Sequence, residues 1–175
     1  MASDFRPGAG TSPLYLAGRE VDENEVNGMF EALVNKVPVS SVIYSGLRGV
    51  GKTVLLNRFQ KIAEEKSIFC KYIEVETRQD FISQIVACSQ AFLREVSSKE
   101  KVKNLLSKAL DALKTLVISF DVKNTTFTVS SQERELYTST SLTQSLTDVF
   151  VYMGQTALET DTPICFFIDE IQYMK

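Results

Sequence analysis

The chain has 175 residues, of which 44% are hydrophobic and 23% charged, with 19 basic and 22 acidic side chains. This is enough chain for one domain with a buried core, and the apolar content is too high for a disordered segment. The net charge of −3 argues against a general polyanion-binding surface but is compatible with a local anion pocket. The absence of histidine excludes His-containing catalytic triads and His-ligated zinc.

No segment of the sequence predicts export or membrane insertion. The longest apolar runs, such as 164–168, fall far short of the roughly 20 residues that a membrane helix needs. The N-terminus lacks the apolar stretch of a signal peptide. Cys70, Cys88 and Cys165 form no C-x-x-C pair, which favours reduced, buried thiols over a redox or metal role. We therefore expect a cytoplasmic protein with no membrane partner.

In the N-terminal part of the chain, an expected arm is followed by a helix, a strand and a second helix. Residues 1–14 are rich in proline and glycine, which predicts an irregular arm. Asp22 and Glu25 have the spacing of a capping box at the start of a helix that stops at Pro38. The apolar, β-branched run 41–45 predicts a buried strand. A glycine-rich turn and an amphipathic helix follow it.

The middle of the chain predicts one more strand and a pair of helices. A strand is expected over 68–75. Thr77 and Asp80 are expected to cap the helix that follows, and Ser97 and Glu100 the next one. Both helices carry apolar residues at helical spacing, so we expect them to pack on the rest of the domain.

The pattern then changes from a helical to an alternating period. Alternation over 118–122 and again over 127–129 predicts a β-hairpin. Together with the helix before it, this hairpin would form an insertion over about 97–138. A further helix is expected over 142–157, and the apolar run 163–168 predicts a last strand.

The order of these elements predicts the class of fold. Strands that alternate with helices, each strand a near-continuous apolar run, imply a mostly parallel sheet covered on both faces. We therefore predict an α/β fold with three αβα layers, interrupted by the helix-pair and β-hairpin insertion.

Residues 46–53 read GLRGVGKT and fit the pattern G-x-x-x-x-G-K-[ST] in full, between an expected strand and an expected helix. Glycines let the turn curl so that backbone N–H groups converge on an anion, which the N-terminus of the helix also favours. Lys52 would place its ammonium on the β- and γ-phosphates, and Thr53 would offer its hydroxyl to Mg²⁺. The residues expected to bind the nucleotide here are Gly46, Leu47, Arg48, Gly49, Val50, Gly51, Lys52, Thr53 and Val54.

Two acids directly follow the last expected strand. Ligands of open parallel sheets bind at the carboxyl ends of the strands, where Asp169 and Glu170 lie. Taken alone, the pair could equally begin a solvated helix. Beside a phosphate-binding loop, Asp169 would hold Mg²⁺ through water, and Glu170 would polarise the attacking water. Lys52 and Glu170 are therefore the expected catalytic residues, and Thr53 and Asp169 the expected metal ligands.

Together the two motifs resemble the Walker A and Walker B motifs of P-loop NTPases, and among these the AAA+ and STAND ATPases. Residues 10–20, GTSPLYLAGRE, are also similar to the segment that precedes the first helix in origin-recognition-like AAA+ ATPases of bacteria and archaea. In those families it lies beside the adenine ring, which would place Leu16, Ala17, Gly18 and Arg19 next to the base. The alternative is that Arg19 ties the arm down by pairing with a carboxylate.

The resemblance also implies that the ATPase domain is incomplete. It divides the chain into an adenine-side arm over 1–20 and an ATPase domain over 21–175. The domain is expected to be partial, because AAA+ domains continue with further strands, an arginine finger and a lid. The strands 41–45 and 164–168 are then expected to keep unpaired edges or to be bridged by another molecule, and such edges associate readily. Since an arginine finger contributes about 10³–10⁵ in rate, we expect this chain to bind ATP with little turnover.

The resemblance implies a function for the intact protein, with ATP and Mg²⁺ as cofactors. ATP hydrolysis would be coupled to the remodelling of DNA or of a protein partner, bound through the missing C-terminal region. Two alternatives stay open: an ATP-gated switch that barely hydrolyses, and a STAND-type signalling or defence protein. Nothing supports DNA contact directly, because the basic residues are spread along the chain.

Overall fold

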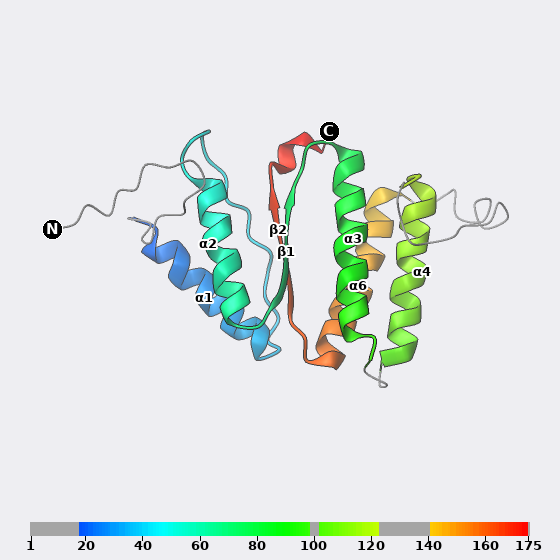
Figure 1. The fold of residues 1–175 in the computed structure, drawn as a ribbon. Helices are drawn as coiled ribbons and strands as arrows, with labels where there is room; N and C mark the ends of the chain where they lie inside the picture. The colour runs from blue at the N-terminus through cyan, green and yellow to red at the C-terminus, as the bar shows by residue number, and fades with distance from the viewer. Residues whose placement is uncertain (1–17, 99–101, 123–140, 175) are drawn as a thin grey trace. The chain divides into compact units, whose positions relative to one another are not determined.

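The computed structural model describes residues 18–98, 102–122 and 141–174, and its elements follow one another in the order drawn in Figure 1. The chain divides into two compact units, Met1–Cys70 and Lys71–Lys175, and each is described by itself.

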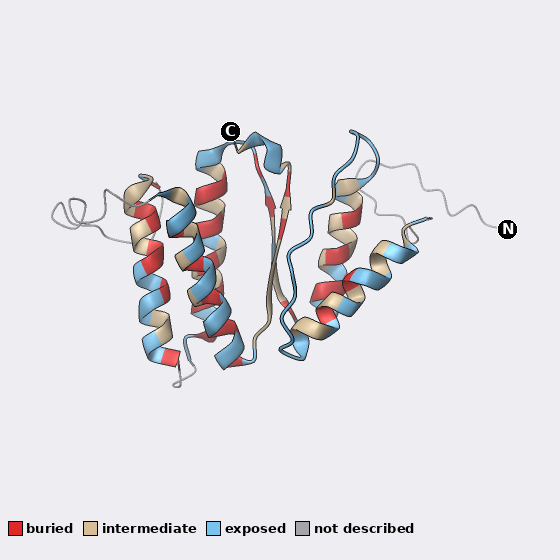
Figure 2. Ribbon diagram, turned by 180° about the vertical axis from the view of Figure 1, so that it is seen from behind, coloured by how far each residue is buried: buried red, intermediate tan, exposed pale blue. Residues whose placement is uncertain are grey.

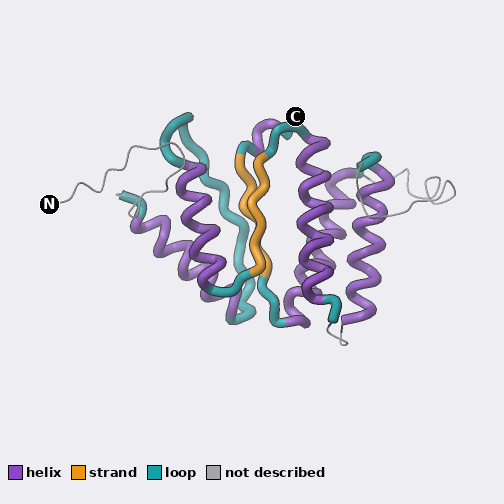
Figure 3. The backbone as a smooth tube through the Cα atoms, viewed as in Figure 1, coloured by secondary structure: helices purple, strands orange, loops and turns teal. Residues whose placement is uncertain are grey.

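The described part of the first unit consists of two packed helices joined by a long loop (Figure 3). α1 spans Glu20–Val34 and α2 spans Lys52–Glu65. Both helices bury apolar residues at helical spacing, namely Val26 and Phe30 in α1 and Leu55, Phe59, Ile62 and Ala63 in α2. Two ion pairs with N···O distances of 3.2 Å also join the helices, Arg58 with Glu23 and Lys66 with Glu31.

The start of α1 differs from the prediction. The helix begins at Glu20 with Arg19 as its N-cap residue and no side-chain capping bond, so the capping box from Asp22 is wrong. The carboxylate of Asp22 instead accepts a hydrogen bond from the Arg19 guanidinium at 3.0 Å. An ionic partner thus takes the place of the backbone N–H that the capping box would have used.

The loop between α1 and α2 contains no strand, so the buried strand predicted over 41–45 is wrong. Ile43 is 81% exposed and Val42 is 44% exposed. Only Tyr44 of this run is half-buried, with its ring 5.4 Å from that of Phe59 on α2. β-Branched residues favour a strand where a neighbouring strand supplies backbone partners, and neither of the described strands pairs with this segment.

The two described strands form one small parallel sheet. β1 spans Phe69–Glu74 and β2 spans Ile164–Asp169, which confirms both strands that the apolar runs predicted. They lie side by side and point the same way (Figure 1). Just past β1, the Val75 N–H donates to the carbonyl of Asp169 at 3.1 Å, which fixes the register at the carboxyl ends of the strands.

Three helices pack on one another in the second unit. They are α3 (Arg78–Val96), α4 (Lys103–Ser119) and α6 (Leu142–Thr160). Their buried residues lie in stripes along each helix (Figure 2). α3 and α6 also contact the strands, through a 2.8 Å bond from Gln84 to the Glu74 carbonyl and through the rings of Phe150 and Phe166 at 5.9 Å.

The helix caps of this unit were predicted with mixed success. The Thr77 hydroxyl accepts from the Asp80 N–H at 3.1 Å, which confirms the predicted start of α3. Ser97 closes α3 as its C-cap residue rather than beginning the next helix. Val102 is the N-cap residue of α4, and Glu100 lies outside the described residues.

The N-terminal part of the predicted β-hairpin is also wrong. Residues 118–119 belong to α4 and residues 120–122 form no strand, while 127–129 lie outside the described residues. Leu116 and Val117 are buried, so the apolar stripe of the helix continues up to the point where alternation seemed to begin. The Val122 N–H then donates back to the carbonyl of Val117 at 3.1 Å and closes the helix.

An α/β chain with a small parallel sheet and mostly helices fits a P-loop fold. Within the second unit, α3 and α6 supply a helical layer on the sheet; the full three-layer arrangement stays a prediction. In the parts of the chain that the structure describes, no helix is long and apolar enough to cross a membrane.

Candidate functional site

The loop over 46–53 has the backbone conformation that its glycines allow. Gly49 and Gly51 have φ values of 85° and 84°, in the left-handed region that other residues rarely adopt. A Cβ atom on Gly46 would lie 3.3 Å from the Val50 side chain, which is tighter than ordinary contact. The glycines are therefore needed for the curl of the loop, and they leave its backbone uncovered by side chains.

The N-terminus of α2 is left open to an anion. Its N-cap residue is Gly51, no side chain caps it, and its first turn contains no acid. α3 differs in having Thr77 as a side-chain cap and Asp80 in its first turn. The N–H groups and the dipole of α2 are thus available to an external negative group.

Lys52, the first residue of α2, folds back over the loop. Its Nζ atom donates to the carbonyls of Gly46 and Leu47, each at 3.0 Å. Thr53 and Arg48 are exposed at the same loop, and their contact with a ligand stays a prediction. The structure therefore gathers one ammonium group and an uncapped helix start at the predicted phosphate loop.

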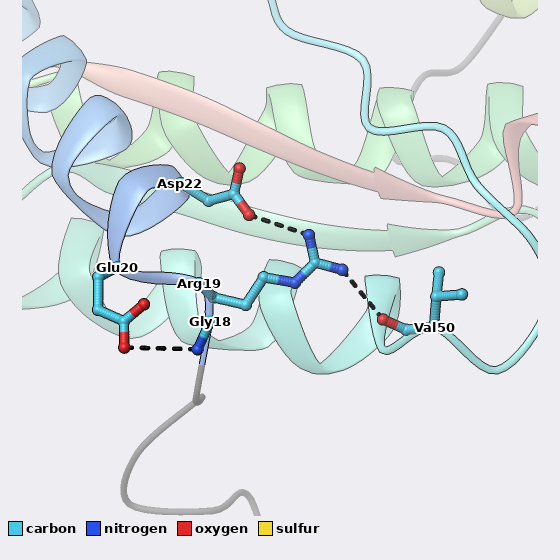
Figure 4. Close-up of polar contacts among 5 residues, drawn as sticks. All are labelled: Gly18, Arg19, Glu20, Asp22 and Val50. Atoms are coloured by element: carbon cyan, nitrogen blue, oxygen red, sulfur yellow. Dashed lines mark hydrogen bonds and ion pairs between the residues drawn. The ribbon is translucent and has the colours of Figure 1, made fainter.

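The structure describes only part of the segment expected beside the adenine base, residues 16–19. Leu16 and Ala17 lie outside the described residues, and Gly18 has a φ of 77°. The Arg19 guanidinium pairs with Asp22 at 3.0 Å and donates to the Val50 carbonyl at 3.1 Å (Figure 4). The alternative role of Arg19, a pairing with a nearby carboxylate, is thus observed, and contact with a base stays a prediction.

Asp169, the last residue of β2, is a buried carboxylate that is 7% exposed. Its Oδ2 atom accepts a hydrogen bond from the Tyr72 hydroxyl at 2.7 Å, and its Oδ1 atom accepts from the Glu170 N–H at 2.9 Å. A buried charge needs such partners because it has lost its hydration. The side chain is therefore held in one orientation by two donors.

Tyr72 is a residue of this site that the sequence reasoning missed. Burial, and then the hydrogen bond to Asp169, raises the pKa of its phenol above the ordinary value, so it remains a donor at neutral pH. One signal was available: a tyrosine inside a strand of a packed sheet usually finds a polar partner for its hydroxyl.

Glu170 lies where β2 passes into a short 3-10 helix over Ile171–Tyr173. Its φ is 56°, a left-handed conformation that costs a residue other than glycine about 1–3 kcal/mol. The carboxylate is half-buried and accepts a hydrogen bond from the Gln172 side-chain amide. Such strain concentrates at functional sites.

The phosphate loop and the acids at the end of β2 both offer oxygen atoms as ligands for a cation. Mg²⁺ prefers oxygen ligands and usually takes one or two carboxylates together with phosphate oxygens and water. The Asp169 carboxylate and the Thr53 hydroxyl, each in its own unit, fit that donor set by their chemistry. Within the described residues, no group of three or more His, Cys, Asp or Glu residues gathers as a separate metal site.

The three cysteines, all of them described, form no disulfide with one another and lie half-buried rather than fully buried. Burial raises the pKa of the Cys88 thiol, although the nearby Lys71 opposes that shift. A raised pKa lowers the fraction of thiolate and so the reactivity of this cysteine.

Comparison with known proteins gives a match to one family. The AAA ATPase domain family matches residues 15–175, which include the phosphate loop, the Asp-Glu strand and the end of the arm. No curated protein and no solved structure matches the chain.

Proposed function

Because the chain belongs to the AAA ATPase domain family, whose members in general bind and hydrolyse ATP, we propose that it binds Mg-ATP with residues 46–54 as the phosphate site. The observation that carries this proposal is the conformation of the loop. Two glycines at positive φ curl the backbone directly before a helix start that has neither a side-chain cap nor an acid. That combination favours an anion and disfavours an apolar or cationic ligand.

Lys52 is the residue that we expect to respond most directly to the phosphates. Without ligand its ammonium is held by two neutral carbonyls, those of Gly46 and Leu47. Phosphate oxygens are charged acceptors and make stronger hydrogen bonds to an ammonium than carbonyls do. We propose that Lys52 exchanges these carbonyls for the β- and γ-phosphates when ATP binds.

The acids at the end of β2 would serve the metal and the water. A bound Mg²⁺ would neutralise charge on the phosphates. Asp169 would hold it through water and Thr53 through its hydroxyl, while Glu170 would orient and polarise the attacking water. The fixed orientation of Asp169 supports this division of roles.

We also propose that ATP binding and hydrolysis are coupled to the remodelling of DNA or of a protein partner. The resemblance of residues 10–20 to the arm of origin-recognition-like ATPases supports this subclass, and it supports a position beside the base for the segment made of Leu16, Ala17, Gly18 and Arg19.

The test is a calorimetric titration of the chain with ATP and Mg²⁺. We expect Lys52→Ala to weaken binding by about 100-fold, because charge-assisted hydrogen bonds contribute roughly 1.5–3 kcal/mol each. Lys61→Ala is the matched control, since Lys61 is an exposed lysine of the same helix outside the loop. Glu170→Gln should keep the affinity of the unaltered chain, because Glu170 is assigned to the water and not to the phosphates.

Two outcomes would contradict the proposal. If the unaltered chain binds no ATP, the phosphate site is absent. If Lys52→Ala and Lys61→Ala bind ATP with equal affinity, the nucleotide lies elsewhere.

A further inference from the structure

Arg19 connects the start of α1 with the phosphate loop, a connection that spans 31 positions of the sequence. One guanidinium nitrogen lies 3.0 Å from the Asp22 carboxylate and another lies 3.1 Å from the Val50 carbonyl (Figure 4). The planar guanidinium presents its donors in a fixed fork, so it can serve two acceptors at once without reorienting. The backbone of Arg19 is itself held, because its carbonyl accepts from the Glu23 N–H at 2.9 Å.

The acceptor on the loop side is a main-chain carbonyl in the middle of the phosphate loop. All described peptide bonds are trans, so the carbonyl of Val50 and the N–H of Gly51 point in opposite directions within one plane. Holding the Val50 carbonyl toward Arg19 therefore turns the Gly51 N–H away from it. Gly51 has a φ of 84° and little intrinsic preference for one orientation, so an external restraint on this peptide matters.

The acids of the first turn of α1 each have a donor. Asp22 is bound by Arg19 and Glu23 by Arg58, while Glu20 accepts from the Gly18 N–H at 3.4 Å (Figure 4). Without Arg19, Asp22 would face the loop as an uncompensated negative charge, which opposes the binding of a phosphate. The arginine thus bonds to the loop and also neutralises Asp22.

We propose that Arg19 is a positioning residue that holds the phosphate loop in its anion-binding conformation through the Val50 carbonyl. The proposal rests on the proposed function, because it concerns the same loop. It differs from base recognition in a measurable way. A residue that positions the loop affects every ligand that carries the phosphates, whereas a residue that contacts adenine affects only ligands that carry the base.

The experiment compares ATP with inorganic tripolyphosphate as competitors of a fluorescent ATP analogue, using the full chain. We expect Arg19→Gln to weaken both competitors by the same factor, about fivefold, the size of one lost hydrogen bond. Arg58→Gln is the matched control: Arg58 also pairs with an acid of α1 and is 39% exposed against 36% for Arg19, but among the described residues its side chain bonds to Glu23 and not to the loop.

A second measurement needs no ligand. In ¹⁵N relaxation, the amide of Gly51 should become more mobile in Arg19→Gln than in Arg58→Gln. The inference is overturned if Arg19→Gln weakens ATP but not tripolyphosphate, if it weakens neither, or if Gly51 is equally mobile in both variants. Failure of the unaltered chain to bind either competitor would instead overturn the proposed function, and the inference with it.

Discussion

The phosphate loop over 46–53 and the carboxyl end of β2 are built in opposite ways. The loop is exposed, and its shape depends on glycines at positive φ. Two long cationic side chains, those of Lys52 and Arg19, also donate hydrogen bonds to carbonyls of the loop. The end of β2 is a buried carboxylate, Asp169, fixed by a tyrosine hydroxyl and a backbone N–H.

Because of this difference, substitutions in the loop should mainly change the affinity for a ligand, and substitutions at the end of β2 should mainly change the stability of the fold. A loop whose groups already lie in water loses little hydration when the protein folds, so its residues can serve a ligand at little cost to the fold. A buried carboxylate and its partners are part of the folded core, so changing them should alter stability even without ligand. Substitutions should therefore cost the most stability where side chains are fully buried and the least in the exposed loop.

The largest effect is expected in the helical core of the second unit. Phe92 of α3 is fully buried, so Phe92→Ala should lower the free energy of unfolding by about 3–5 kcal/mol through lost contacts and a cavity. Urea denaturation followed by circular dichroism measures this change. Leu158→Ala is the control, because Leu158 of α6 is 52% exposed and should cost much less. Equal losses in the two variants would show that the packing of α3 is not as described.

The Tyr72–Asp169 bond should give the next largest effect. Tyr72→Phe removes a donor from a buried carboxylate and should lower the free energy of unfolding by about 1–3 kcal/mol. Ser89→Ala is the opposite case. The buried Ser89 hydroxyl has no hydrogen-bond partner among the described residues, so its removal should be neutral or stabilising. If Tyr72→Phe were neutral as well, Asp169 would not depend on this donor.

The same bond predicts a pH dependence. The pKa of Tyr72 is raised above the ordinary value of about 10, first by burial and then by Asp169, so the folded chain retains this proton longer than the unfolded one. The contribution of the protonated Tyr72 to the free energy of unfolding is complete below pH 10. It is lost as the pH rises beyond that value, by up to about 1.4 kcal/mol per pH unit. Tyr72→Phe should make the decline shallower. It should not abolish it, because burial, followed by Glu25 and Asp22, also raises the pKa of Tyr44.

The smallest stability effect is expected in the phosphate loop. Gly49→Ala forces an alanine to a φ of 85° and should cost about 1–2 kcal/mol, although nothing lies within 4 Å of the added Cβ. Gly28→Ala is the matched control in the same unit, because Gly28 is equally open but helical; it should stabilise the chain by about 0.5–1 kcal/mol. Thermal unfolding of both variants measures the difference, and effects of the same sign would contradict the strained loop.

Part of the fold could be predicted from local pattern alone. The apolar runs 68–75 and 163–168 form the two described strands, and helical spacing located α2, α3 and α6. These predictions succeeded because an apolar stripe of the right period has one obvious way to be buried. The run 41–45 is also apolar and β-branched, yet it is largely exposed and pairs with neither described strand, because a strand also needs a neighbour to receive its hydrogen bonds.

The sequence by itself determined the phosphate-binding pattern, the placement of two acids at the end of a strand and the left-handed turns that only glycine adopts cheaply. All of these are local properties of consecutive residues. Only the tertiary structure decided that Tyr72 supports Asp169 and that Arg19 holds the Val50 carbonyl. Those pairs are separated by 97 and 31 positions, and no local period or propensity can encode which distant donor reaches which acceptor.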